Sequence, residues 1–357
     1  MRGVSHAASA AGDDGREQGA AEQALGDGAE GMAVRPPAPM RPWRMPRAAA
    51  VGAVLGLILA VQVLYFQRGF VPGDAFVYLA AGERLNDGHL LYALSPGDRP
   101  VDIHPPYWWI PFVSPPLLAV LWRPLALLGE AAPYCWWVLG VATLLTSVAM
   151  LLRRRPLLTA LALLVLSVPV VYEVGVGNVN AFLLFGFLTA WRAFAGGRPS
   201  VSGSLVAVAA ALKVTPIMAA WWAIAVGGRR AAVGVLITVA VAAAVSLGGA
   251  GLANHLAYIE ALTSGAVGFS PLSLGGMLRF AGLPEPAARV LVWVAAFAAV
   301  LLIWKLRRRP DRSFQAAVVA MIAASPAVSI NWFVLLLALL APVAWPVPRR
   351  PGVTPSG

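Results

Sequence analysis

Asp74 is the first residue of this chain whose type and position could carry chemistry. It follows Pro72 and Gly73, just after the first long apolar run. A carboxylate at such a place can act as a general base when a substrate hydroxyl comes within hydrogen-bond distance. Aspartate is also a common helix N-cap. The residue type alone leaves both roles open.

Lys213 is a second candidate, because it lies in the middle of an apolar stretch. A cation in a membrane is costly, and an intramembrane ionisable residue is therefore a functional hypothesis. Pro216 disfavours helix at Thr215 and can open a new helix N-terminus. An ammonium beside that N-terminus would suit a phosphate. The alternatives are a lysine that extends to the membrane surface and a structural pair with Glu173.

Two polar breaks supply further candidates. Residues 175–180 hold Asn178 and Asn180 among glycines, a composition typical of a tight turn. The same amides could instead face a polar cavity. A second break contains Ser325 and, a little further on, Asn331, with the same two interpretations.

The composition predicts that a membrane must position these groups. Of the 357 residues, 59% are hydrophobic and 12% charged, whereas soluble domains carry about 25% charged residues. Apolar runs recur that are long enough to cross a hydrocarbon core of about 30 Å. Helices satisfy their own backbone groups in lipid. We therefore expect an all-α, multi-spanning helical bundle.

The net charge of +11 has a similar explanation. Most arginines lie in clusters between apolar runs, where they set topology and contact anionic membrane lipids. No basic stripe carries interleaved aromatic residues, which excludes nucleic-acid binding. The single cysteine, Cys135, is expected to be a small packing residue.

The chain divides into three parts. We expect residues 1–46 to form a disordered cytoplasmic tail, residues 47–346 a polytopic domain, and residues 347–357 a short C-terminal tail. The first span should cover residues 48–66. It is followed by a polar extracytoplasmic loop, residues 67–112, with a short interfacial helix from Asp74 to Leu85. Tyr107, Trp108 and Trp109 in this loop are typical of an interfacial aromatic belt.

Ten further apolar runs follow the loop, at about 114–128, 134–152, 156–173, 180–195, 201–212, 214–227, 231–249, 287–304, 313–328 and 331–346. Simple alternation of spans places Arg153, Arg154 and Arg155 outside the cell, whereas the positive-inside rule places them inside. Either one run is not a full span, or the rule fails locally.

Histidines and acids in the loop raise the question of a metal. Asp102 and His104 could share a divalent cation with Asp74. The spacing of His89 and His104 matches no zinc pattern, however, and no thiolates accompany them. No metal-ligand residues are therefore predicted, and a divalent cation stays open as a cofactor.

The order of several short motifs resembles glycosyltransferase family 87, a group of bacterial GT-C-type membrane glycosyltransferases. The likeness covers about residues 48–345. It is carried by a series of motifs in the same order as in the family, namely Asp74 with Tyr78 and Gly82, Asp87 to Tyr92, Phe112 to Leu117, Trp122 to Leu125, Gly177 to Asn180, Ala211 to Pro216, Ser270 to Leu274 and Ser325-Pro326.

This resemblance implies an inverting transfer of a hexose, with mannose first and arabinose second, from a polyprenyl-phosphate sugar to a lipid-linked or envelope glycan. The reaction would occur on the outer face of the bacterial cytoplasmic membrane. Asp74 falls on the family's catalytic aspartate, and Lys213 would neutralise the departing lipid phosphate. The remaining candidates for substrate binding are Asn178, Asn180, Tyr78 and His104, of which His104 would replace a histidine that many members carry after the late Ser-Pro.

Two other classes remain as alternatives. In a membrane transporter or lipid flippase, Asp74 and Lys213 would couple to the substrate. A non-catalytic member of the family would keep the fold and tolerate substitution at both residues. The acids gathered in one external loop favour the enzyme.

Overall fold

The computed structural model describes residues 52, 56, 60, 72–92, 112–263 and 268–347. Several sequence-based expectations fall outside these residues: the tail 1–46, most of the first span, the aromatic belt at 107–109, His104, and all but the first residue of the C-terminal tail. Of the expected first span, Gly52, Gly56 and Ala60 are described, and they are helical.

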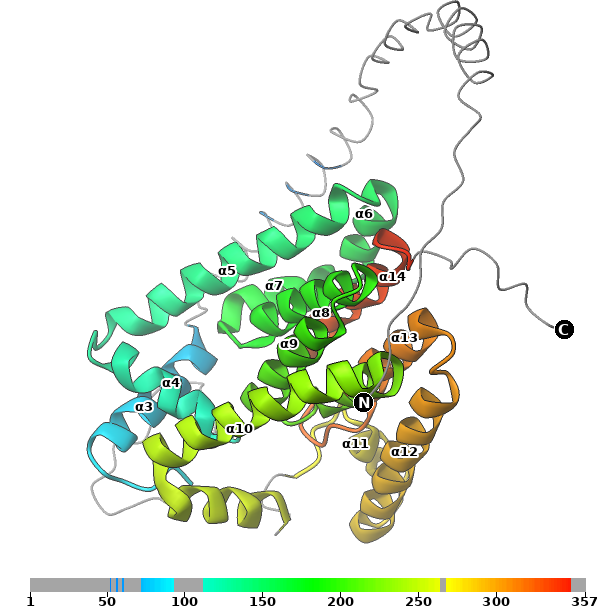
Figure 1. Ribbon diagram of the computed structural model, residues 1–357. Coiled ribbons are helices and arrows are strands. Elements are labelled where there is room, and N and C mark those ends of the chain that lie inside the picture. Colours follow the sequence, from blue (N-terminus) through cyan, green and yellow to red (C-terminus); the bar gives the residue numbers. More distant parts are fainter. Residues whose placement is uncertain are drawn as a thin grey trace, which may run out of the picture. The chain divides into compact units, whose positions relative to one another are not determined.

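Every regular element in the described residues is a helix, as the apolar composition predicts (Figure 1). The elements are α3 (Gly73–Asn86), α4 (Pro116–Ala126), α5 (Ala131–Leu152), α6 (Pro156–Val165), α7 (Ser167–Val176), α8 (Asn180–Ala195), α9 (Pro199–Leu212), α10 (Ile217–Thr263), α11 (Leu274–Phe280), α12 (Glu285–Lys305), α13 (Pro310–Ala323), the 3-10 helix η1 (Ile330–Leu340) and α14 (Ala341–Ala344).

In the part of the chain that the structure describes, three helices are long and apolar enough to cross a membrane, namely α5, α10 and α12. Helices α6 and α7 form a fourth candidate span, bent by 72°. Helix α10 is not continuous, because the backbone turns to positive φ at Gly228 and Gly251. Glycine is the residue that adopts this conformation without strain. The middle segment, residues 229–250, has the length of one span, about 33 Å. The described residues thus belong to a multi-pass, all-α membrane protein.

Helix α4 explains the conflict between span alternation and the arginine cluster. It has 11 residues, or about 16 Å, and is too short to cross a 30 Å core. It packs on α3 instead, where Gly82 approaches so closely that an added Cβ would lie 2.8 Å from the Trp122 carbonyl oxygen. The run at 114–128 is therefore not a full span, and α5 becomes the first complete span after the polar loop.

Helix α8 occupies the centre of the main core. It packs against α5, α9 and η1, and its fully buried Trp191 stacks on Trp222 of α10 and contacts Phe314 of α13. The predicted break at Lys213 is confirmed, since α9 ends at Leu212 and α10 begins at Ile217. Aromatic packing of α8 and α13 on Trp222 fixes the α10 side of this break, and α9 on the other side packs against α8 and α10.

Among the described residues, contacts bring several arginine-bearing junctions to one end of the helices, which we call the arginine end: the junctions at 153–155, 192–198, 229–230 and 305–312. Arg155 donates to the carbonyl oxygen of Val343 at 2.9 Å, and Trp191 donates to that of Trp345 at 2.9 Å. Trp222 donates to the carbonyl oxygen of Pro310 at 3.2 Å. These bonds join chain junctions that are far apart in the sequence.

Candidate functional site

Asp74 lies in the first turn of α3, but it does not cap this helix. Pro72 occupies the N-cap position, and no side chain bonds to the free amides there. The Asp74 carboxylate instead accepts a hydrogen bond from Nδ2 of Asn178 at 2.5 Å. Burial raises the pKa of Asp74, while Asn178 and Lys213 act in the opposite direction. Of the two roles left open by the sequence, the structure excludes the N-cap.

A left-handed turn at Gly177 brings Asn178 to Asp74. Helix α7 ends at Val176, and Gly177 has φ of +65°, the usual conformation of a glycine that ends a helix. Its carbonyl oxygen accepts from the indole Nε1 of Trp136 at 3.0 Å. A Cβ on Gly177 would lie 3.1 Å from Cβ of Pro72. The turn predicted for this segment is thus also a contact surface for the start of α3.

Lys213 lies at the break between α9 and α10 in extended conformation. Its Nζ donates to Oδ1 of Asn180 at 2.9 Å and to Oδ1 of Asn178 at 3.5 Å. It also lies 3.5 Å from the centre of the Trp332 ring, a cation–π contact. The ammonium therefore points into the protein and does not extend to the membrane surface.

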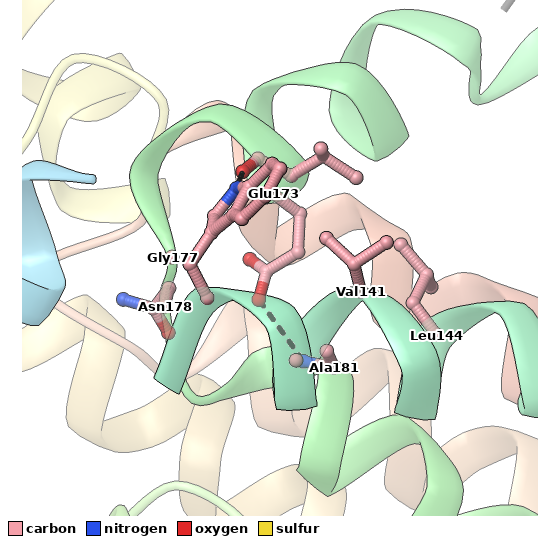
Figure 2. A pocket seen from close by; sticks show the side chains of 9 residues that line it. Val141, Leu144, Glu173, Gly177, Asn178 and Ala181 are labelled. Carbon is pink, nitrogen blue, oxygen red and sulfur yellow. Dashed lines mark hydrogen bonds between the residues drawn. The ribbon is translucent and has the colours of Figure 1, made fainter. Parts of the chain in front are cut away.

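Glu173 completes the arrangement from α7 and is buried, with 2% of its surface exposed. Its carboxylate accepts from Nδ2 of Asn180 at 3.1 Å, from the backbone amide of Ala181 at 3.0 Å, and from Nδ2 of Asn331 at 3.0 Å. Figure 2 shows Glu173 directed at Ala181, with Asn178 on the opposite side of the turn. Glu173 is not paired directly with Lys213, because the Asn180 amide lies between them.

These contacts form a chain of alternating charges and amides. Asn178 and Asn180 each present an oxygen to the Lys213 ammonium and an NH2 group to a carboxylate, Asp74 in one case and Glu173 in the other. An ammonium has only donors and a carboxylate only acceptors. The charges therefore fix the orientation of both amides. We call these five residues the charge chain.

Tyr78 lies one turn beyond Asp74 on α3. It is buried, forms a hydrogen bond with the Val179 backbone, and packs against the rings of Trp122 and Trp136. It thus supports the wall of the site behind Asp74. His104 lies outside the described residues, and its role remains a prediction. His89 is described and exposed, and it forms none of the charge-chain contacts given above.

Asn331 and Trp332 also belong to the site, although the sequence predicted only the polar break in which they lie. The two Ser-Pro segments hold this break in position. Ser270 donates through its backbone amide to the carbonyl oxygen of Pro326 at 3.0 Å and through Oγ to that of Val328 at 2.6 Å. Asn331 then reaches Glu173 from the start of η1. In the sequence, Asn331 was indicated only by the polar break at 325–331 and by the two Ser-Pro motifs, Ser270-Pro271 and Ser325-Pro326.

A small hollow adjoins Glu173 on the side of α5 (Figure 2). The volume open to the centre of a water molecule is about 10 Å³, at the lower limit for holding one water. This hollow is too small for a sugar. Within the described ranges, no three His, Cys, Asp or Glu side chains form a group that could hold a metal ion. The hypothesis of a cation shared with Asp102 and His104 involves undescribed residues and stays untested.

The fold and the site define a multi-pass membrane protein in which the buried Glu173 carboxylate and the half-buried Asp74 carboxylate are joined through amides to the half-buried Lys213 ammonium. The sequence model of glycosyltransferase family 87 matches residues 112–329, more than half of the chain. The chain belongs to glycosyltransferase family 87 and is thus a membrane glycosyltransferase. No curated protein and no solved structure matches significantly. The match includes Glu173, Asn178, Asn180 and Lys213 but not Asp74.

Proposed function

We propose that this protein transfers a hexose from a polyprenyl-phosphate sugar to a lipid-linked or envelope glycan, with inversion at the anomeric carbon. The observation that carries the proposal is the charge chain, which places a half-buried carboxylate, Asp74, and a half-buried ammonium, Lys213, on either side of one amide, Asn178. Family membership gives the reaction class. The resemblance in motif order gives the donor class, with mannose as the first sugar to test.

Asp74 is the general base in this proposal. An acceptor hydroxyl attacks the anomeric carbon as its proton passes to the Asp74 carboxylate. The bond between that carbon and the phosphate oxygen breaks, and the lipid phosphate leaves with the electron pair. General-base assistance of this kind typically contributes 10²–10⁴-fold in rate. Burial supports the role, because a carboxylate with a raised pKa is a stronger base.

Lys213 provides the charge that the departing phosphate needs. Transition-state stabilisation by a fixed cation requires no covalent step. The ammonium is anchored by its shorter contact to Asn180 at 2.9 Å, whereas its contact to Asn178 is long at 3.5 Å. A phosphate oxygen could take the place of the longer contact without disturbing the anchor. The transporter alternative has no comparable support from the family match.

The arginine end indicates the orientation in the membrane. Positive clusters favour the cytoplasm, so the charge chain should face the opposite, extracytoplasmic side of a bacterial inner membrane. Trp136 lies in the second turn of α5, about 8 Å from the helix start, and it bonds to Gly177 beside the charge chain. We therefore propose that the site lies about 8 Å below the outer end of α5, at a depth that a lipid-linked donor can reach from the bilayer.

The decisive experiment measures sugar transfer by purified, reconstituted protein from synthetic polyprenyl-phosphate mannose. We expect Asp74→Asn to reduce the rate by two or more orders of magnitude, the range of a lost general base. Asp87→Asn is the matched control, since Asp87 lies at the other end of α3 and is exposed. Full activity of Asp74→Asn would refute the role of Asp74. Absence of transfer from a panel of lipid-linked sugars would refute the donor class.

A further inference from the structure

The charge chain holds two carboxylates but only one ammonium, and this imbalance has a consequence for Asp74. Among the described residues, Lys213 forms no direct ion pair with either carboxylate, because the Asn178 and Asn180 amides lie between them. The ammonium lies closer to the Asn180 side, at 2.9 Å, than to the Asn178 side, at 3.5 Å. Lys213 is thus held on the side of Glu173.

Glu173 cannot move to follow the ammonium. Its carboxylate accepts three hydrogen bonds, from Asn180, Asn331 and the Ala181 backbone, and these donors come from α8 and η1. These three hydrogen bonds favour the charged form of the Glu173 carboxylate, whereas its burial acts against that form. A cation that is partly removed from water needs a compensating anion nearby, and Glu173 supplies that charge through the amide of Asn180.

We propose that Glu173 is a positioning residue that holds the Lys213 ammonium away from Asp74 and thereby keeps Asp74 basic. This inference rests on the proposed function, in which Asp74 is the base. Without the Glu173 charge, Asp74 is the only anion in the charge chain that can pair with Lys213. A direct pair would stabilise the ionised carboxylate of Asp74 and make it a weaker base.

The charged and titratable groups that bear on this equilibrium are few. Asp74 and Tyr78 come from α3, Glu173 and Tyr172 from α7, and Lys213 from the break after α9. The remaining polar groups around Glu173 are amides, which do not titrate. A change of the Glu173 charge should therefore act on Asp74 in two ways, directly and through Lys213.

The test follows the protonation of Asp74 without any substrate. A hydrophobic carbodiimide modifies protonated carboxyl groups, and mass spectrometry of the Asp74 peptide gives the labelling rate at each pH. We expect Glu173→Gln to lower the midpoint of Asp74 labelling by about one pH unit or more, the effect of an opposite charge at close range. Glu173→Asp, which keeps the charge, should shift the midpoint less. Thermal unfolding of each purified variant checks that it has folded.

A Lys213→Met background separates the two routes. If Glu173 acts through Lys213, the shift caused by Glu173→Gln should fall by at least half in this background, because no ammonium remains to pair with Asp74. An equal shift with and without Lys213 would overturn the proposal, as would an unchanged midpoint in Glu173→Gln. Should Glu173→Gln fail to fold, Asn180→Leu, which cuts the amide link between Glu173 and Lys213, should lower the midpoint in its place.

Activity provides an independent readout. In the active protein, Glu173→Gln should move the acid limb of kcat/KM to lower pH and reduce kcat. If the wild-type protein transfers no sugar, the proposed function is contradicted, but the labelling experiment still tests whether Glu173 controls the protonation of Asp74. A labelling midpoint that does not respond to Glu173, in a protein that does transfer sugar, would contradict only the role of Glu173.

Discussion

Gly177→Ala tests whether the left-handed turn positions the catalytic carboxylate. Two effects follow from the structure. The φ of +65° at Gly177 is unfavourable for alanine, and the new Cβ would lie 3.1 Å from Cβ of Pro72 and 3.4 Å from Cβ of Ala75. Because Asp74 lies between these two residues, relief of the contact must move Asp74 relative to Asn178.

Gly177→Ala should lower both the free energy of unfolding and the rate of sugar transfer. Left-handed backbone costs an L-residue about 1–2 kcal/mol, and the lower entropy of the unfolded alanine chain offsets about 0.4–1 kcal/mol of this. The net destabilisation is about 1 kcal/mol. Carbon atoms in contact prefer about 3.5–4.0 Å, so the start of α3 must shift by about 0.4 Å. If a 1 Å misplacement costs about 100-fold, this shift lowers the transfer rate about sixfold.

The assay combines thermal unfolding in one detergent with kcat for transfer in proteoliposomes. Gly186→Ala is the matched control, because Gly186 lies inside α8 and, apart from the neighbouring backbone of α8 itself, no atom lies within 4 Å of the added Cβ. This control should keep full activity and gain up to about 1 kcal/mol of stability from its lower unfolded-state entropy. Wild-type kcat and wild-type stability in Gly177→Ala would refute the argument that this turn positions Asp74.

Two further predictions concern pH and orientation. Burial raises the pKa of Asp74 above its ordinary value of 3.8. Because a general base acts only when it is ionised, kcat/KM should rise with pH through that raised pKa. A profile that stays flat down to about pH 4 would contradict the role of Asp74 as general base. The orientation is tested with two single-cysteine variants, Asp87→Cys and Arg154→Cys, each made in a Cys135→Ser background. A membrane-impermeant maleimide added to intact bacterial cells should label the Asp87→Cys variant, and it should label the Arg154→Cys variant only after permeabilisation. The reverse pattern would place the site on the cytoplasmic side.

The sequence by itself determined the class of protein and much of its local structure. An apolar chain with recurring runs of about 20 residues can only be helical in lipid, and the helix expected from Asp74 to Leu85 is present as α3. Pro216 predicted the break after Lys213 because proline limits the backbone locally. Gly177 and the neighbouring amides predicted a turn for the same kind of reason. These features depend on a few consecutive residues.

The tertiary structure decided how these local features combine. Residues from α3, the turn after α7, α8 and the break after α9 meet only through packing, and Asn331 joins them through contacts between two distant Ser-Pro segments. Periodicity cannot reveal that an amide would separate Lys213 from each carboxylate. Nor could the apolar run at 114–128 show by its composition that α4 packs on α3 instead of crossing the membrane. Such outcomes depend on contacts between residues far apart in the chain, which local composition does not determine.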